Sequence, residues 1–449
     1  MSGHEVRRRF LGWLLIGALW AGMVGVGAAD PAPPSEEPRG SQMAGKGFRI
    51  STGPARDVGH RVAYNATDTE YLVVWADWRD YLGARGIDLY GRRIDADGTR
   101  LGPAFRISRA EDIYDDESAA VVWNAARSEY LVVWVRAADI WDPGRIEEVY
   151  GRRIKGDGTF TGPAFQISGP IDFGGVYQPT VAWNSVHDQY LVVWQDYRDG
   201  EDFIYGRRID GSGVFLGAEF RIGGAKANDT AGPVVAFNAT NTEYLVLWED
   251  SRNYATRGLD LYARRVDADG TRLGNDFRVS SAKAEENEWG ASVEWNAALN
   301  QYLVVWCDER DAWYRGTDIY GVRLKGADGT RLGGDVRLVG PGDVGDDFVG
   351  GLAWNATTGR YLLTLSTSDG GWKYGWDVFG QRLSAEGKRQ GKAFRIIPPK
   401  GSPEADLTDD RGGQLAWDGA NNRYLVVWVD YRLESQNVNL DVWGRLVVG

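Results

Sequence analysis

The sequence contains very little cysteine and histidine. Cys307 is the only cysteine among 449 residues, so an intrachain disulfide and a metal cluster held by several thiolates are both excluded. Of the three histidines, His4 lies in an N-terminal segment that we expect to be removed. His60 and His187 occupy non-equivalent positions in the repeats described below, which gives little support to histidine-based catalysis or zinc binding. The sequence therefore predicts no metal and no cofactor.

Positive charge is also in deficit. Lys and Arg number 51 against 63 Asp and Glu, which gives a formal net charge of −12. Nucleic acids and anionic membrane surfaces reward dense Lys and Arg, so we expect neither as a partner. Beyond the N-terminal segment there is no second long apolar run, so we expect no membrane insertion of the mature chain.

The N-terminal segment has the features of an export signal. Three arginines at 7–9 precede an apolar stretch at 10–26, and small residues follow as far as Ala29. An uncleaved anchor helix is the alternative, but several glycines interrupt the stretch. We therefore predict a signal peptide over 1–29, a disordered Pro-rich linker over 30–46, and export to the periplasm or the cell exterior.

One apolar segment occurs seven times along the chain. YLVVWADWRD at 71–80 returns with changes at copies that start at 130, 190, 244, 302, 361 and 424. The segment is apolar at every position rather than at alternate positions. A strand with both faces covered needs this pattern.

Each repeat carries four short strand signals. The first ends in an aromatic residue and Asn, as in VAYN at 62–65, and the second is the YLVVW segment. The third is DLYGRRI at 88–94 and the fourth is FRIS at 105–108, with the turn DADGT at 95–99 between them. We interpret this turn as a tight hairpin rather than a calcium loop, because equivalent turns lose the carboxylates. Four-stranded sheets stacked face to face around an axis form a β-propeller.

The two ends of the chain supply complementary parts of one blade. DVWGRLVVG at 441–449 is a third strand without a fourth, and FRIS at 48–51 is a fourth strand without a third. Pairing them removes exposed sheet edges. The sequence therefore predicts an all-β fold, a seven-bladed β-propeller of four-stranded antiparallel blades over 47–449, closed by pairing of the N- and C-terminal strands. We expect a monomer.

The repeats resemble a group of secreted bacterial propeller-repeat proteins that carry YLVVW-x-D-x-R, DIYG-x-R and D-x-DGT. Here these motifs stand, for example, at 71–79, 318–323 and 95–99. The resemblance covers essentially the whole mature chain, and it implies the propeller fold and export. No activity common to that group is known, so the resemblance assigns no functional residue.

Five repeats end the second strand in Trp-x-Asp-x-Arg. Residues two apart in a strand share a face, so the Asp and Arg can reach the Asp that opens the adjoining third strand, or the next blade. We interpret the motif as structural bracing. Seven equivalent ligand sites are the alternative, but two repeats lack the motif. The predicted bracing residues are Asp77, Arg79, Asp196, Arg198, Asp250, Arg252, Asp308, Arg310, Asp430 and Arg432.

Function is expected at one end of the propeller. The loops that join strands two and three, and those that join one repeat to the next, are long, variable and emerge at the same end. Their Trp and Tyr, mixed with carboxylates, suit a carbohydrate or a protein partner, although rings can also pack loops onto blades. We expect Trp141, Trp313 and Trp376 around a shared concavity. The candidate ligand-binding aromatic residues are Trp78, Trp141, Tyr177, Tyr197, Trp289, Trp313, Trp372, Trp376 and Tyr431.

Glu294 departs from the pattern of the first strands, where its six equivalents are Ala or Val. In a central channel it could bind a ligand or act as an acid or base, or simply face water. We predict an exported, non-catalytic binding or scaffold protein that recognises a surface carbohydrate or a protein partner through the long-loop face. A carboxylate-based hydrolase of the glycoside hydrolase type is the alternative, and it needs a second positioned carboxylate.

Overall fold

The structure is a computed structural model. It describes residues 42–53, 56–79, 86–109, 114–137, 147–169, 175–198, 200–224, 230–281, 286–339, 345–368, 375–397, 410–430, 433–434, 437–438 and 440–449. The predicted signal peptide and most of the predicted linker lie outside these residues. Within them, no helix combines the length and the apolar character that a membrane span requires.

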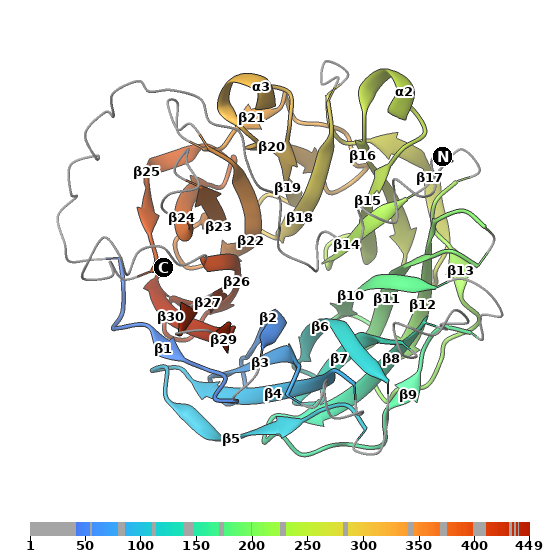
Figure 1. Cartoon of the computed structure of the whole chain (residues 1–449). Coiled ribbons are helices and arrows are strands. Elements are labelled where there is room, and N and C mark those ends of the chain that lie inside the picture. Colours follow the sequence, from blue (N-terminus) through green and yellow to red (C-terminus); the bar gives the residue numbers. More distant parts are fainter. Residues whose placement is uncertain are drawn as a thin grey trace. The chain divides into compact units, whose positions relative to one another are not determined.

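Seven four-stranded antiparallel sheets form a ring, which is the seven-bladed β-propeller that the sequence predicts (Figure 1). Within blades 1 to 6 the strands follow one another in chain order from the centre outward. Blades 1 to 3 are β2 (Asp57–Asn65), β3 (Glu70–Asp77), β4 (Asp88–Asp95), β5 (Arg100–Arg106); β6 (Asp115–Asn124), β7 (Glu129–Ala137), β8 (Glu147–Lys155), β9 (Phe165–Gln166); and β10 (Val176–Asn184), β11 (Gln189–Asp196), β12 (Phe203–Asp210), β13 (Phe220–Arg221). Blades 4 to 6 are β14 (Ala231–Asn238), β15 (Glu243–Asp250), β16 (Asp260–Asp267), β17 (Arg272–Arg278); β18 (Glu288–Asn296), β19 (Gln301–Asp308), β20 (Asp318–Lys325), β21 (Val336–Arg337); and β22 (Asp347–Asn355), β23 (Arg360–Ser368), β24 (Trp376–Ser384), β25 (Arg389–Arg395).

The seventh blade contains both ends of the propeller. Its strands are β26 (Asp410–Asp418), β27 (Arg423–Asp430), β30 (Asp441–Val448) and β1 (Phe48–Arg49). β1 pairs antiparallel with β30, so the predicted closure by the two terminal strands is confirmed. Small elements follow the second strands of blades 4, 5 and 7, namely α2 (Tyr254–Arg257), α3 (Ala312–Arg315) and the hairpin of β28 (Leu433–Glu434) and β29 (Asn437–Val438).

The boundary predicted for the linker needs correction. The N–H of Ala44 donates to the carbonyl of Leu446 at 3.0 Å, and the N–H of Val448 donates to the carbonyl of Gln42 at 2.9 Å. Residues 42–46 therefore belong to the seventh blade rather than to the linker. Their backbone groups extend the pairing along β30. Composition alone does not reveal such backbone pairing.

The YLVVW segments form the second strand of each blade. β3, β7 and β11 are buried at every position. One face of β3 carries Tyr71, Val73 and Trp75 and packs against blade 7, while the other carries Leu72 and Val74 and packs against blade 2. Both faces are covered, which explains why the segment has no polar alternation. Truncation of one such buried tryptophan to alanine is expected to cost about 3–5 kcal/mol.

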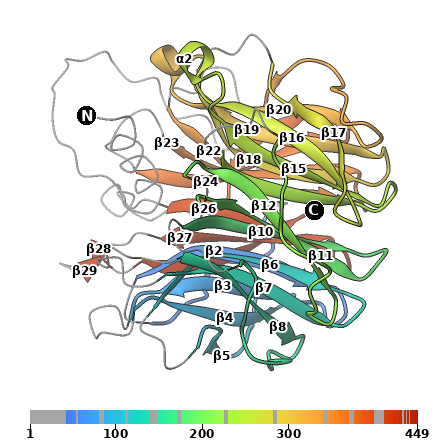
Figure 2. The same cartoon turned by 90° about the vertical axis from the view of Figure 1, so that its right-hand side faces the viewer.

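The long loops of a blade meet at one end of the ring. The N–H of Trp78, just after β3, donates to the carbonyl of Arg56, just before β2, at 2.9 Å, and Tyr197 makes the equivalent bond to Gly175 at 3.0 Å. We call this end the loop face and the opposite end the turn face. Figure 2 shows α2 and the β28–β29 hairpin on the same side of the ring, the loop face.

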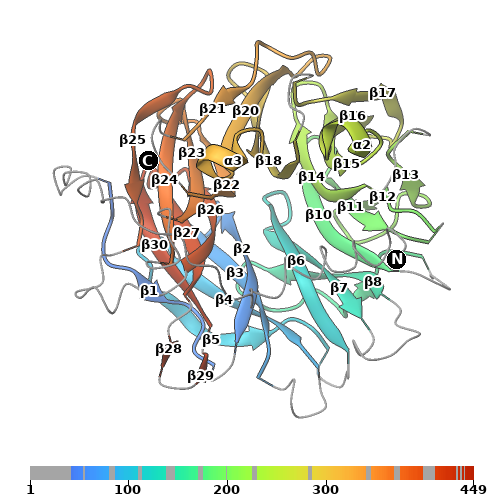
Figure 3. The same cartoon turned by 45° about the horizontal axis from the view of Figure 1, so that its top comes forward.

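The first strands surround the centre of the ring (Figure 3). Each has a register shift near the loop face, and in β2 the shift contains Gly59, whose φ of 62° suits a residue without a Cβ. In contrast to β3, β18 is partly exposed at every position between its buried ends. Because neighbouring first strands flank it on both sides, the solvent that it contacts lies on the axis of the ring.

The DADGT turns lie on the turn face and are ordinary hairpins. The N–H of Gly98 donates to the carbonyl of Asp95 at 2.9 Å, and the N–H of Thr99 donates to Oδ1 of Asp97 at 2.8 Å. These bonds use the Asp side chain to close the turn. Across the described residues, no cluster of three or more His, Cys, Asp or Glu has a metal-binding arrangement.

Candidate ligand-binding face

The Asp and Arg of the repeated motif bind each other. Nε of Arg310 donates to Oδ1 of Asp308 at 2.7 Å, and Nη2 donates to Oδ2 at 2.5 Å. The guanidinium lies 4.0 Å from the ring centre of Tyr320, and Nε1 of Trp306 donates to Asp308 at 2.9 Å. The same ion pair forms between Asp77 and Arg79, Asp196 and Arg198, and Asp250 and Arg252. The pair of Asp430 cannot be assigned, because Arg432 lies outside the described residues.

The third-strand Asp, one of the two partners that the sequence offered, is not the ion-pair partner of Arg310. The Asp of the third strand binds the Arg of the outer strand instead, as Asp318 does with Arg337 at 2.5 Å. The motif Arg310 also reaches Asp335, near the outer strand, at 3.0 Å. The N–H of Ser281 in blade 4 donates to that same carboxylate at 3.2 Å. The motif therefore connects neighbouring blades through an intervening carboxylate.

Carboxylates form a row across the loop end of blade 5. Glu288 opens β18 opposite Asp308, which lies opposite Asp318. Burial is the main cause that raises the pKa of Glu288 to about 8; Asp308 raises it further, and the hydrogen bond from Ser280 opposes the rise. In blade 1, burial followed by the charge of Asp77 raises the pKa of Asp57 to about 8. Both carboxyl groups therefore hold a proton near neutral pH.

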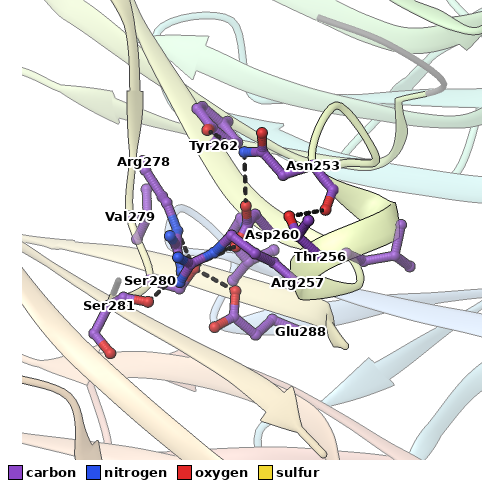
Figure 4. A network of polar contacts seen from close by, with 12 residues as sticks. Asn253, Thr256, Arg257, Asp260, Tyr262, Arg278, Val279, Ser280, Ser281 and Glu288 are labelled. Carbon is purple, nitrogen blue, oxygen red and sulfur yellow. Dashed lines mark hydrogen bonds and ion pairs between the residues drawn. The ribbon is translucent and has the colours of Figure 1, made fainter. Parts of the chain in front are cut away.

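Figure 4 shows Glu288 beside a polar network centred on Asp260 of blade 4. Arg278 binds Asp260 at 2.9 Å, and Nδ2 of Asn253 donates to Asp260 at 3.2 Å and to the hydroxyl of Tyr262 at 3.3 Å. Asn253 directly precedes α2, so the network fixes this helix to the third strand of its blade. Asp260 and Glu288 are buried, so this network supports the loop face from below.

Three aromatic rings from two adjacent blades lie in contact on the loop face. The rings of Trp289 and Phe348 are 5.0 Å apart and edge to face, and those of Phe348 and Trp376 are 4.6 Å apart and stacked. The guanidinium of Arg411, from blade 7, lies 4.8 Å from the ring centre of Trp376. The three aromatic residues and Arg411 are all partly exposed. We call Trp289, Phe348 and Trp376 the aromatic cluster.

Polar groups hold the edge of the aromatic cluster. Nε1 of Trp289 donates to Oε1 of Glu309 at 3.0 Å, and Nδ2 of Asn287 donates to Oε2 of Glu309 at 2.8 Å. Trp289, Phe348 and Arg411 occupy equivalent positions, just before the register shift of their first strands. Phe348 and Arg411 were not among the predicted site residues. Alignment of the first-strand starts would have placed them beside Trp289.

The exposed rings of the small helices lie apart from this cluster. Trp313 and Tyr314 on α3 are 90% and 87% exposed, and Tyr254 on α2 is 55% exposed. Among the described residues, no ring contact joins Trp313 to Trp376. The expected grouping of Trp141, Trp313 and Trp376 around a concavity stays a prediction, because Trp141 lies outside the described residues.

The other predicted aromatic residues lie on different blades. Trp78 stands 5.2 Å from the guanidinium of Arg56 in blade 1. Tyr177 is 36% exposed at the loop end of β10, and Tyr197 follows β11 in the same blade. The structure does not describe Trp372 and Tyr431.

Glu294 and Cys307 lie on the first and second strands of blade 5. The N–H of Trp354 in blade 6 donates to Oε1 of Glu294 at 3.4 Å, and burial raises the pKa of this carboxyl to about 7. Glu294 retains partial exposure toward the axis. The thiol of Cys307 is buried and accepts from the N–H of Val349 at 3.4 Å, and burial raises its pKa. This environment is that of an unreactive thiol.

Comparison with known proteins identifies the fold and no more. No family model matches the sequence, and no curated protein does. A puromycin hydrolase mutant complexed with PGG is similar in structure, with 14% identity and a TM-score of 0.51 over 86% of this chain and 53% of that chain. The GH93 α-L-arabinofuranosidase of Fusarium graminearum, complexed with arabinobiose, gives 12% identity and a TM-score of 0.49 over 74% and 93%. A protein of unknown function from Dyadobacter fermentans has 10% sequence identity and a TM-score of 0.46, over 90% of this chain and 98% of that chain.

Proposed function

We propose that this protein binds carbohydrate, without catalysis, at the aromatic cluster of the loop face. The observation that carries the proposal is the contact of three partly exposed rings, at 5.0 and 4.6 Å, beside Arg411 and Glu309. The C–H faces of a sugar stack on such rings. Its hydroxyls bond to neighbouring carboxylate, amide and guanidinium groups.

The rigidity of the cluster supports this role. Trp289 and Phe348 lie on first strands and Trp376 opens a third strand, so strand pairing fixes all three positions. Glu309 further fixes the indole of Trp289. A preformed surface loses less conformational entropy on binding than a loop does. Export, which the N-terminal segment favours, is part of the proposal and would present this surface to glycans outside the cytoplasm.

A protein partner is the second candidate, and α3 favours it. Trp313 and Tyr314 project from one helical turn with 90% and 87% exposure, and Arg315 beside them is also exposed. Trp, Tyr and Arg are the residues that contribute most often to binding hot spots. This surface is separate in its residues from the aromatic cluster, so mutations can test the two independently.

The hydrolase alternative needs two carboxyl groups that reach a ligand, about 5–10 Å apart. The two acids of the loop end whose pKa is raised to about 8, Asp57 and Glu288, are fully buried. Glu294 borders the axis, but its carboxylate faces the backbone of Trp354. Hydrolysis therefore stays a hypothesis, to be tested by assaying every glycan that binds for cleavage.

A glycan array probed with the full protein tests the proposal. We expect binding to at least one glycan, loss of that binding in the double variant Trp289→Ala and Trp376→Ala, and retention in Trp313→Ala. A blank array, or binding that survives the double variant, contradicts a glycan site at the cluster. Loss of a captured protein partner in Trp313→Ala, with a blank array, would favour the second candidate.

A further inference from the structure

Arg61 is a charged residue on the innermost strand of blade 1. It lies opposite Val74 in the pairing of β2 with β3. The residues at the equivalent pairing position in the first strands of the other six blades are all uncharged. They are Ala120, Thr180, Val234, Ser292, Gly351 and Gln414. Among the seven first strands, Arg61 is therefore the only charged residue at this pairing position.

No acid of the described residues forms an ion pair with Arg61. Its guanidinium makes one hydrogen bond, from Nη1 to the backbone carbonyl of His60 at 2.9 Å. A guanidinium carries five N–H donors, so most of those of Arg61 have no acceptor among the described residues. Burial lowers the pKa of Arg61, and no neighbouring carboxylate opposes that change. The residue nevertheless keeps partial exposure, so it borders the solvent on the axis.

Neighbouring titratable groups leave this charge uncompensated. His60 lies beside Arg61, but burial lowers its pKa to about 4, and its Nε2 contacts the carbonyl of Gly412 at 2.5 Å. Glu294 lies at a different pairing position, opposite Leu303, and its carboxylate accepts a hydrogen bond from the N–H of Trp354. A cation removed from bulk water without an anion is unfavourable, so the site favours a negatively charged guest.

Along the axis of the ring, Arg61 lies deeper than the aromatic cluster of the loop face. Trp289 lies opposite Cys307, on the rung that corresponds to Val58 opposite Ala76 in blade 1. Arg61 pairs two residues further along β3, which is about 7 Å along the strand. Blades 6 and 7 lie between blade 1 and Trp289 of blade 5, so a ligand of several sugar units is needed to reach both residues. The planar fork of a guanidinium matches the two oxygens of a carboxylate.

We propose that Arg61 binds a carboxylate on the axis of the ring, so that the ligand of the loop face is an acidic glycan that carries a uronic acid. This inference rests on the proposed glycan-binding function and names its ligand class. Arg61 supplies the charge selectivity, and the aromatic cluster supplies the stacking surface.

The test is an array on which each uronic-acid oligosaccharide is printed beside its methyl ester, which has the same shape without the charge. We expect the full protein to prefer the acid over its ester, and titration calorimetry on the best pair to give at least a tenfold difference in affinity. In Arg61→Gln we expect that preference to vanish, while affinity for the ester stays unchanged. Arg61→Lys keeps the charge and should keep part of the preference, and Arg100→Gln, which removes an exposed arginine from the outer strand of the same blade, should keep all of it.

Equal binding of acids and esters by the unmodified protein would overturn this inference and leave the glycan site intact. Neutral glycans that bind while uronic acids do not would overturn it as well. If sodium sulfate alone binds, loses affinity in Arg61→Gln, and no acid is preferred over its ester, the site takes free inorganic anions and the acidic-glycan assignment is wrong. An array blank for every glycan rejects both proposals together.

Discussion

Phe48 and Gly444, from opposite ends of the propeller sequence, lie opposite each other where β1 pairs with β30. A Cβ on Gly444 would come within 2.8 Å of Ile50 and 3.4 Å of Phe48, so the glycine lets these two side chains pack closely onto β30. The equivalent glycine of blade 1, Gly91, lies under Ile107 and Phe105 in the same way. The terminal strand thus completes blade 7 with the same packing that the other blades build within one repeat.

Removal of this strand is expected to destabilise the whole ring. A variant that lacks residues 1–51 loses β1 and the fully buried Ile50, and it exposes the edge of β30. We expect a loss of at least about 3 kcal/mol in the free energy of unfolding and a tendency to aggregate. Urea denaturation and size-exclusion chromatography measure these effects. A variant that lacks only residues 1–41 is the control, and equal stability of the two variants would contradict the closure argument.

Arg310→Ala tests the connection between blades 4 and 5. The change leaves the buried carboxylate of Asp308 without its cation, whereas Asp335 loses one of its two arginines and keeps Arg331. We expect the free energy of unfolding to fall by about 3 kcal/mol. Arg315→Ala removes an exposed arginine from the adjacent α3 and serves as the matched control, with an expected change below about 0.5 kcal/mol. Similar effects of the two substitutions would show that the motif does not stabilise the fold.

Glu288 should make stability depend on pH. Its pKa is about 8 in the folded protein, above the ordinary value of 4.5, so the native state retains a proton that the unfolded chain releases. This stabilising contribution is complete below pH 4.5 and is lost as pH rises through 8. Glu288→Gln lacks this dependence, so its stability relative to the unmodified protein should improve between pH 5 and pH 8 by up to about 1 kcal/mol per pH unit. Urea titrations across this range measure the difference, and parallel pH profiles of the two proteins would refute the assignment.

Glu309 is expected to act on binding through Trp289. Glu309→Ala removes the acceptor of both the Trp289 indole and the Asn287 amide, so the ring loses its fixed orientation. We expect affinity for an array-selected glycan to fall about tenfold, close to 1.4 kcal/mol, with little change in stability. Glu286→Ala removes the same charge from an exposed position nearby and should leave affinity unchanged. Equal affinities for the two variants would separate Glu309 from the binding surface.

The fold followed from the sequence because its repeated signals are local. The apolar run at 71–75 predicts a strand with both faces covered, and β3 is buried on both faces. The pairing of 48–51 with 441–449 was predictable because the first is a fourth strand without a third and the second is a third strand without a fourth. Strand spacing fixes which face Arg310 takes, but it left open whether the Arg reaches the third-strand Asp or the next blade. The structure pairs it with Asp308 and Asp335.

The candidate site was only partly predictable for a different reason. Trp289 and Trp376 were visible as aromatic residues near strand ends, but their contact through Phe348 joins neighbouring blades. Arg61 could not be singled out from the sequence, because only the strand registers show that its six equivalents are uncharged. The pKa of Glu288 depends on its depth in the fold, which residue spacing does not report.

Hydrogen–deuterium exchange, with and without the strongest glycan from the array, tests most directly whether the loop face is the binding surface. The account predicts slower exchange at 286–290, 347–349 and 410–412, where the aromatic cluster and Arg411 meet the loop face. It predicts no change in the turn-face hairpins, for example at 95–99. Protection confined to the turn face, or a bound glycan that protects none of the three loop-face segments, would contradict it.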